Sequence, residues 1–180
     1  MQVVTWGGIM GKRSDFKRKP KDYYPTPIEA VMPLVPHLPK RDLFAAPCAG
    51  DGRLIRHIEE LTNLRGYWMT DIEPQADFVG NGNALTDKIL GCDVCITNPP
   101  WDRKILHPII ENLSNQLPTW LLFDSDWMHT KQATKYMPLV RTIVSVGRVK
   151  WFDNMSGKDN CCWYLFSPSS YQTSTFFYGR

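Results

Sequence analysis

The five residues from Thr97 to Trp101, TNPPW, constrain the fold of this chain more than any other stretch. They follow the apolar run CDVCI at 92–96, which has the composition of a buried strand. Proline has no backbone N–H and a fixed φ, so two consecutive prolines end a strand. The chain is therefore expected to leave a sheet abruptly here, with the amide of Asn98 and the indole of Trp101 held at the exit.

Apolar runs on both sides of this motif alternate with segments of helical spacing. One helix is expected to begin at Ile28, since Ile28, Val31, Met32 and Val35 recur at helical spacing. Strands are expected at 41–47, 66–71, 92–97 and 119–126, and helices at 53–62 and 104–117. This alternation predicts a parallel sheet of the α/β class.

The end of the chain has a different pattern. Two β-rich runs at 141–152 and 160–168 are separated by DNMSGKD, with Gly157 in the expected loop. The sequence therefore predicts a Rossmann-like α/β fold, mostly parallel, completed by a C-terminal antiparallel hairpin. With 180 residues, we expect a single domain over 23–180, preceded by a basic arm at 1–22.

The composition is that of a soluble protein, with 43% apolar and 22% charged residues. No apolar run approaches the roughly 20 residues that cross a bilayer. The five cysteines are odd in number and irregularly spaced, so we expect reduced thiols in the cytoplasm. The segment 11–22 holds six Lys or Arg against two Asp, which suits either phosphate contacts or a solvated tail.

Two loops at the expected carboxyl edge of the sheet suggest a nucleotide-like ligand. PCAGDG places Gly50 and Gly52 between a strand and a helix, where a backbone can approach a ligand closely. Asp71 ends the next strand, 19 residues after Gly52, a separation at which a carboxylate meets ribose hydroxyls. Each residue alone could serve only a turn or a cap. Together they suggest an adenosine-containing cofactor, although the dinucleotide fingerprint and the P-loop are both absent.

The TNPPW motif has the parts needed to methylate an exocyclic amino group. The lone pair of such a group is delocalised into its ring. An amide oxygen and a backbone carbonyl, held rigidly by prolines, can accept both amino hydrogens and draw the nitrogen toward tetrahedral geometry. An aromatic ring beside them can stack on an extruded base. The candidate catalytic residues are Asn98, Pro99, Pro100 and Trp101.

These motifs resemble those of amino methyltransferases that use S-adenosylmethionine. NPPW is similar to their motif IV, PCAGDG to motif I, YWMTDIEPQ to motif II and GNAL to motif III. YPTP at 24–27 resembles the motif that precedes motif I in many adenine methyltransferases, and VGRVKWF…NCCWYLF is similar to their closing hairpin. The resemblance spans about Tyr23 to Phe166. It is closest to small phage and bacterial DNA N-6-adenine methyltransferases.

The resemblance implies a class I methyltransferase sheet and roles for individual residues. Gly50 and Gly52 would approach the methionine part of the cofactor, and Asp71 would bind its ribose. Ile72 would pack on the adenine and Asn83 would contact its amino group. The other implied cofactor-binding residues are Tyr24, Thr26, Pro47, Cys48, Ala49, Asp51 and Ala84.

Two positions depart from the family pattern. Ala46 stands where the family usually has an acid that helps to hold the methionine group, and Asp51 is a candidate substitute. Asn83 replaces a usual Asp, but its amide oxygen can still accept a hydrogen bond.

The resemblance implies duplex DNA with a flipped adenine as the substrate, in a bacterial host cell if the protein is phage-encoded. Little of the chain is left for a target-recognition domain, so specificity is expected to be short or absent. Alternatives are methylation of RNA adenine or of a protein glutamine, or an inactive fold that binds nucleic acid. No metal is expected, and the oligomeric state stays open. Phosphate contacts are assigned to Lys17, Arg18, Lys19, Arg148 and Lys150.

A few other residues invite a functional interpretation. Cys92 and Cys95 have zinc-like spacing, but on one strand they would point to opposite faces. Trp151 and Trp163 are expected in the core, whereas Trp127 suits either the base pocket or the core. The four histidines are scattered, which favours surface or capping roles.

Overall fold

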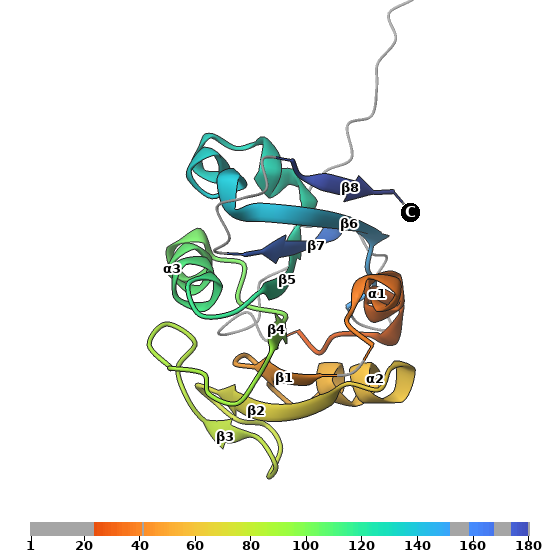
Figure 1. Cartoon of the computed structure of the whole chain (residues 1–180), viewed down its shortest axis with the longest axis vertical. Helices are drawn as coiled ribbons and strands as arrows, with labels where there is room; N and C mark the ends of the chain where they lie inside the picture. The colour runs from red at the N-terminus through yellow and green to blue at the C-terminus, as the bar shows by residue number, and fades with distance from the viewer. Residues whose placement is uncertain (1–23, 41, 152–158, 168–173, 180) are drawn as a thin grey trace, which may run out of the picture.

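The computed structural model describes residues 24–40, 42–151, 159–167 and 174–179. The expected basic arm, with Lys17, Arg18 and Lys19, lies outside these ranges, as does Gly157 of the expected hairpin loop. Within these ranges the chain forms one sheet of eight strands in the order β3-β2-β1-β4-β5-β7-β6-β8 (Figure 1). The strands are β1 Leu43–Ala46, β2 Arg65–Asp71, β3 Gly80–Asn81, β4 Val94–Thr97, β5 Thr119–Asp124, β6 Val140–Arg148, β7 Asn160–Phe166 and β8 Phe176–Tyr178.

The pairing directions confirm the predicted α/β fold. Strands β1 to β5 pair in parallel, and β7 pairs antiparallel with both β5 and β6. The short β8, which the sequence did not predict, adds to the free edge of β6 in parallel. The sheet is therefore mostly parallel and ends in an antiparallel hairpin, as expected.

Helices cover both faces of the sheet, and each face has its own buried cluster. The α-helices are α1 Ile28–Val31, α2 Arg53–Leu61 and α3 Arg103–Ser114, and the 3₁₀ helices are η2 Met32–His37, η3 Ser125–His129, η4 Lys131–Lys135 and η5 Met137–Leu139. In Figure 1, α1 and α2 lie on one side of the sheet and α3 on the other. Among the described residues, every helix is too short or too polar to cross a bilayer.

The first helical segment differs from its prediction. After one α-helical turn the chain tightens into η2, which begins with Pro at its second position and contains Pro36. A 3₁₀ helix repeats every three residues, so Val31 and Leu34 share the buried face. Met32 is instead 56% exposed, and the expected α-helical face through Met32 and Val35 is wrong.

The order of the strands locates the ligand-binding edge. From β1 the chain moves outward through β2 and β3, and it then returns to place β4 on the other side of β1. In open α/β sheets, ligands bind outside the carboxyl ends of the strands where the order reverses. The loop after β1 and the TNPPW motif after β4 both lie at this position.

Candidate active site

Backbone hydrogen bonds join the loop after β1 to the ends of both neighbouring strands. The N–H of Cys48 donates to Oγ1 of Thr97, at 3.2 Å, and the N–H of Ala49 donates to the carbonyl of Thr70, at 2.9 Å. The N–H of Gly50 donates to Oδ2 of Asp71, at 2.8 Å. The glycine loop, the end of β2 and the end of β4 therefore form one connected structure, as the sequence motifs predicted.

The glycine loop needs the conformational freedom of its two glycines. Gly50 and Gly52 have φ values of 54° and 74°, in the left-handed region that favours glycine. At Gly52 the ring of Phe78 lies so close that an added Cβ would stand 2.1 Å from its Cζ. The guanidinium of Arg56 lies 5.3 Å from the centre of the same ring. Phe78 thus covers the loop, a role that no pattern in the sequence indicated.

Both carboxylate oxygens of Asp71 accept a backbone hydrogen bond. Its Oδ2 accepts from Gly50, and its Oδ1 accepts from the N–H of Glu73, at 2.9 Å. A carboxylate offers about four lone pairs, so each oxygen can still accept a hydroxyl. The next side chain, Ile72, is 62% exposed and available to pack on a ring.

The third loop of the expected cofactor site is held by local bonds. Oδ1 of Asn83 accepts from the N–H of Leu85, at 3.0 Å, and the N–H of Asn83 donates to Oδ2 of Asp87, at 2.9 Å. Ala84 turns its side chain into the buried cluster beneath α3, and its carbonyl accepts from Asn112. Asn83 therefore shapes the loop, and Ala84 offers a ligand only its backbone.

The position of Ala46 is apolar and fully buried, in the cluster on the α2 side of the sheet. The carboxylate of Asp51, the candidate substitute for the missing acid, binds Arg53 instead. Its Oδ1 accepts from the N–H of Arg53, and its Oδ2 lies 3.4 Å from the guanidinium. The assignment of Asp51 to the cofactor stays a prediction.

Cys48 is not poised as a nucleophile. Burial, with a smaller contribution from the Asp71 carboxylate, raises the pKa of the Cys48 thiol to about 12. The thiol is therefore protonated at neutral pH and lacks the thiolate that covalent catalysis requires. Pro47 precedes it at the end of β1.

Asn98 is held at both ends of its amide. Its Nδ2 donates to Oγ1 of Thr26, at 3.1 Å, and to the carbonyl of Tyr24, at 3.3 Å. Its Oδ1 accepts from the indole N–H of Trp101, at 3.3 Å. These bonds fix which end of the amide is the acceptor, and Oδ1 keeps a second lone pair for a ligand. Pro99 is buried, which immobilises the chain directly after this amide.

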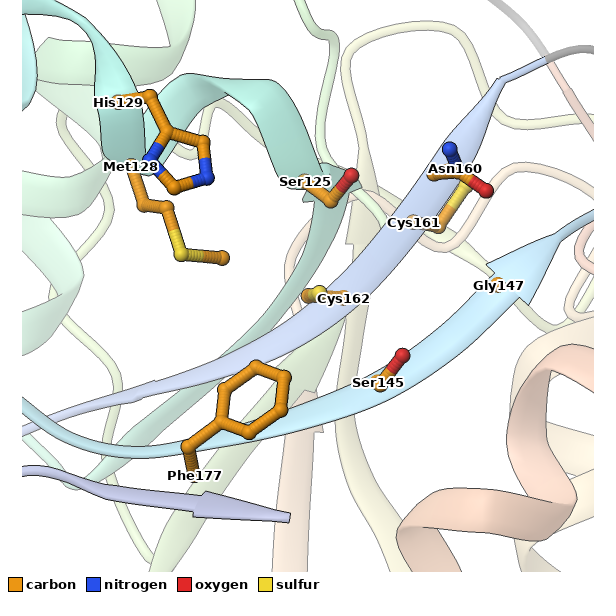
Figure 2. A pocket seen from close by; sticks show the side chains of 9 residues that line it. All are labelled: Ser125, Met128, His129, Ser145, Gly147, Asn160, Cys161, Cys162 and Phe177. Carbon is orange, nitrogen blue, oxygen red and sulfur yellow. The ribbon is translucent and has the colours of Figure 1, made fainter. Parts of the chain in front are cut away.

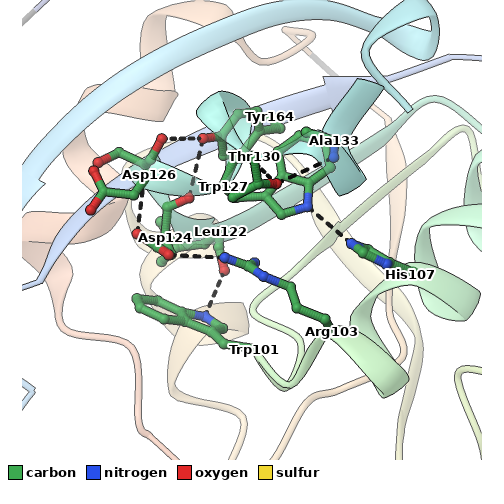
Figure 3. Close-up of polar contacts among 11 residues, drawn as sticks. Trp101, Arg103, His107, Leu122, Asp124, Asp126, Trp127, Thr130, Ala133 and Tyr164 are labelled. Atoms are coloured by element: carbon green, nitrogen blue, oxygen red, sulfur yellow. Dashed lines mark hydrogen bonds and ion pairs between the residues drawn. The ribbon is translucent and has the colours of Figure 1, made fainter. Parts of the chain in front are cut away.

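Trp101 is fixed to the neighbouring strand. Its indole N–H also donates to the carbonyl of Leu122 in β5, at 3.1 Å. Next to this bond, the guanidinium of Arg103 pairs with Oδ2 of Asp124, at 3.0 Å (Figure 3). The hydroxyl of Tyr164 donates to the Asp124 carbonyl, at 3.2 Å. α3, β5 and β7 thereby hold the TNPPW motif in one place.

Strand β5 ends at Asp124, two residues earlier than expected. The Asp124 side chain accepts from the N–H of Asp126 and begins η3. Trp127 follows in η3 and is fully buried, so it packs in the core and does not line the base pocket.

The buried indole of Trp127 donates to Nε2 of His107, at 3.1 Å. His107 is thus a partly buried hydrogen-bond partner of Trp127, which its scattered position in the sequence did not indicate. Burial and the Arg103 guanidinium lower the pKa of His107, consistent with a neutral imidazole that accepts this bond.

Three aromatic rings form a cluster that the Trp101 indole N–H joins to the Asn98 amide. Trp101 and Trp151 meet edge to face with centroids 5.6 Å apart, and Tyr24 lies 5.9 Å from Trp151. The core prediction is confirmed for Trp163, which is fully buried and donates to the carbonyl of Ala30. Trp151 is only half-buried and belongs to the candidate site. Its position just after β6 gave no such signal, because a long-range contact brings it there.

Two of the residues predicted to contact phosphates lie at the carboxyl edge of the sheet. Arg148, at the end of β6, and Lys150 are both exposed there, near the start of β7.

The two cysteines with zinc-like spacing do not share a strand. Cys92 lies before β4, whereas Cys95 is buried in that strand. In the part of the chain that the structure describes, no group of three or more His, Cys, Asp or Glu could hold a metal ion.

Comparison with solved structures shows the fold. A dimethyladenosine transferase from Plasmodium falciparum is similar over 77% of this chain and 59% of its own length, with 15% identity and a TM-score of 0.52. A provisionally assigned RNA methyltransferase from Pyrococcus horikoshii matches over 82% and 87%, with 12% identity and a TM-score of 0.56. A 23S rRNA methyltransferase matches over 78% and 67%, with 12% identity and a TM-score of 0.53.

No protein-family model and no curated protein matches the chain. The chain spans less than two thirds of the length of the Plasmodium protein. These likenesses show that the chain has the Rossmann-like fold of class I methyltransferases.

Proposed function

We propose that this protein transfers a methyl group from S-adenosylmethionine to the exocyclic amino group of adenine in DNA. The observation that carries the proposal is the fixed amide of Asn98, whose Oδ1 is oriented as an acceptor at the carboxyl end of β4. An acceptor in this position selects a substrate that donates N–H, which an exocyclic amino group does. The sequence resemblance through NPPW supports adenine as the ring.

The residues at the ends of β1 and β2 fit the cofactor. Asp71 keeps one lone pair on each oxygen for the two ribose hydroxyls, and the exposed Ile72 can pack on the adenine. Gly50, bonded to Asp71, brings bare backbone beside it, where the methionine part would lie, whereas the ring of Phe78 covers Gly52. The cofactor, when bound, supplies an electrophilic methyl group on a sulfonium.

The chain's own residues bind the amino group of the substrate and orient it. Asn98 Oδ1 and a backbone carbonyl of the proline pair accept the amino hydrogens and hold the nitrogen with its lone pair turned toward the methyl group. Trp101, whose indole N–H binds this amide, lies in an aromatic cluster with Trp151 and Tyr24. Positioning of this kind lowers the barrier without a covalent intermediate.

Adenine in RNA is the second candidate substrate. Two similar solved structures favour it, a dimethyladenosine transferase and a 23S rRNA methyltransferase. A protein glutamine amide would also meet the acceptor requirement of Asn98. An inactive fold that binds nucleic acid is the alternative that Ala46 favours, because no acid stands at that position.

The test is a transfer assay with labelled S-adenosylmethionine and three acceptors: duplex DNA, single-stranded DNA and RNA. Products are digested to nucleosides, and proteins in the mixture are analysed for label. Methyladenine is expected from DNA with the wild-type protein, and it should vanish with Asn98→Ala. Asn63→Ala, which removes an exposed amide in the turn after α2, is the matched control. Label in RNA or protein alone would refute the DNA assignment, and calorimetry showing no cofactor binding would favour the inactive fold.

We further propose that Arg148 and Lys150, with Lys17, Arg18 and Lys19, bind phosphates of the nucleic acid. Such contacts release counterions, so the affinity for DNA should fall steeply with salt. Replacing Arg148 and Lys150 by Gln should reduce the slope of log affinity against log salt by roughly 1 to 2. Binding that does not depend on salt would contradict this assignment.

A further inference from the structure

A cavity lies at the carboxyl edge, on the antiparallel side of the sheet. Its volume is about 340 Å³, at the lower end of the range of ligand pockets. Residues of η3, β6, β7 and β8 surround it (Figure 2). They are Ser125, Met128, His129, Ser145, Gly147, Asn160, Cys161, Cys162 and Phe177.

Four polar side chains of this cavity have no hydrogen-bond partner. Ser125, His129, Ser145 and Asn160 make no side-chain hydrogen bond or ion pair to any residue in the described part of the chain. Hydroxyl, amide and imidazole groups can each take part in hydrogen bonds. The cavity therefore presents a set of hydrogen-bonding side chains that is available to a ligand.

The rest of the lining is apolar and polarisable. Phe177, which is 60% exposed, contributes its ring from β8, and Met128 contributes its thioether from η3 (Figure 2). Burial raises the pKa of the Cys162 thiol in β7 to about 11, so this part of the lining is uncharged. No Asp, Glu, Lys or Arg is among the described lining residues. Such a lining fits a neutral planar heterocycle better than a phosphate or a metal ion.

The cavity is close in the fold to the candidate active site. Ser125 directly follows Asp124, which pairs with Arg103, and Trp101 is bonded to Leu122 in the same strand. At the other end of the cavity, Asn160 stands opposite the exposed Arg148 in the β6–β7 pair. A nucleic acid strand with one base at Asn98 and a phosphate at Arg148 would pass over this cavity.

We propose that this cavity binds a second nucleobase of the substrate strand, a neighbour of the base that is methylated. The inference rests on the proposed function, because it takes the Asn98 site as the place of methyl transfer. The amide of Asn160 and the hydroxyl of Ser145 meet the hydrogen-bonding edge of that base, and Phe177 and Met128 contact its face. This second base gives the protein a preference for sequence context without a separate recognition domain.

The test measures sequence context and total methylation separately. The wild-type protein and a Ser145→Ala/Asn160→Ala variant methylate a pool of random-sequence DNA, and the modified sites are sequenced. The wild type should prefer particular bases at one neighbouring position. In the variant, the ratio of methylation between the preferred base and the other bases at that position should fall roughly tenfold, while total methylation changes little. Asn63→Ala should leave both unchanged. A wild type with no neighbour preference, or a variant that keeps it, would overturn the proposal.

A binding measurement separates failure of the pocket from failure of the proposed function. The chain has four histidines, so the ring protons of His129 can be assigned by NMR with a His129→Gln variant. Adding nucleosides and dinucleotides to the full chain should shift the His129 signal, but not in the Ser145→Ala/Asn160→Ala variant. If no methylation is found while His129 still shifts, only the proposed function has failed. An unchanged His129 signal at saturating dinucleotide would refute the proposal that the cavity binds a nucleobase.

Discussion

Replacing Thr26 by Val tests whether the orientation of the Asn98 amide matters for catalysis. Thr26 is 3% exposed, and its hydroxyl accepts from Asn98 Nδ2 at 3.1 Å. Val keeps the shape of the side chain but removes the acceptor, so Nδ2 retains only the Tyr24 carbonyl at 3.3 Å. Losing one partner of a partly desolvated amide costs about 1–2 kcal/mol. Because about 1.4 kcal/mol is a factor of ten in rate, kcat should fall by roughly 5- to 30-fold.

The assay is steady-state methyl transfer, with kcat and KM for the nucleic acid determined separately. Thr26→Ser keeps the hydroxyl and is the matched control, so its kcat should stay close to that of the wild type. Thermal unfolding of each variant shows whether the fold is intact. The reasoning is refuted if Thr26→Val turns over at the wild-type rate, or if Thr26→Ser is as slow as Thr26→Val.

Three further changes have definite expected outcomes. Trp101→Phe keeps a ring but removes the indole N–H that binds β5 and the Asn98 amide, so kcat should fall about tenfold in the transfer assay, with KM less affected. The lowered pKa of His107 means that the unfolded chain binds more protons, so stability should fall as pH drops below about 6.5. His107→Gln, which can still accept from Trp127, should flatten that dependence in urea unfolding at pH 7 and 5. Gly52→Ala should destabilise the fold by about 1–2 kcal/mol, measured in urea, because its φ is 74° and the Phe78 ring occupies the Cβ position.

Each of these has an outcome that contradicts it. A wild-type rate for Trp101→Phe would show that only the ring matters, as in simple stacking. If the free energy of unfolding changes equally with pH in the wild type and in His107→Gln, His107 is not the group whose titration changes stability. Gly80→Ala is the control for Gly52→Ala, because an added Cβ there meets ordinary contacts at 3.6 Å. Equal losses at the two glycines would refute the argument from φ.

The fold was predictable because its signals are local. Prolines after β4 and glycines after β1 ended strands where the sequence placed their ends, and the apolar face of α2 through Leu54, Ile55 and Ile58 is buried. β8 was missed because it has only three residues, all exposed, and exists through its pairing with β6. Strand pairing of this kind leaves no periodic pattern in the sequence.

The candidate site was predictable only in part, for a related reason. Asn98, Gly50 and Asp71 follow strands whose ends meet at one edge, so their meeting could be expected. Trp151 and Phe78 reach the site through loops, whose course depends on packing and not on periodicity. The same holds for Thr26, whose bond to Asn98 spans 72 residues of sequence.

The position of β7 has a consequence for biosynthesis. Although it follows β6 in the chain, β7 lies between β5 and β6 in the sheet and pairs with both. Until Asn160–Phe166 is in place, residues 140–148 cannot join the strands β1 to β5, and the edge of β5 stays open. An open edge formed by the buried residues of β5 is prone to pair with other chains. A chain truncated before Asn160 should therefore aggregate, whereas one that includes Phe166 should not.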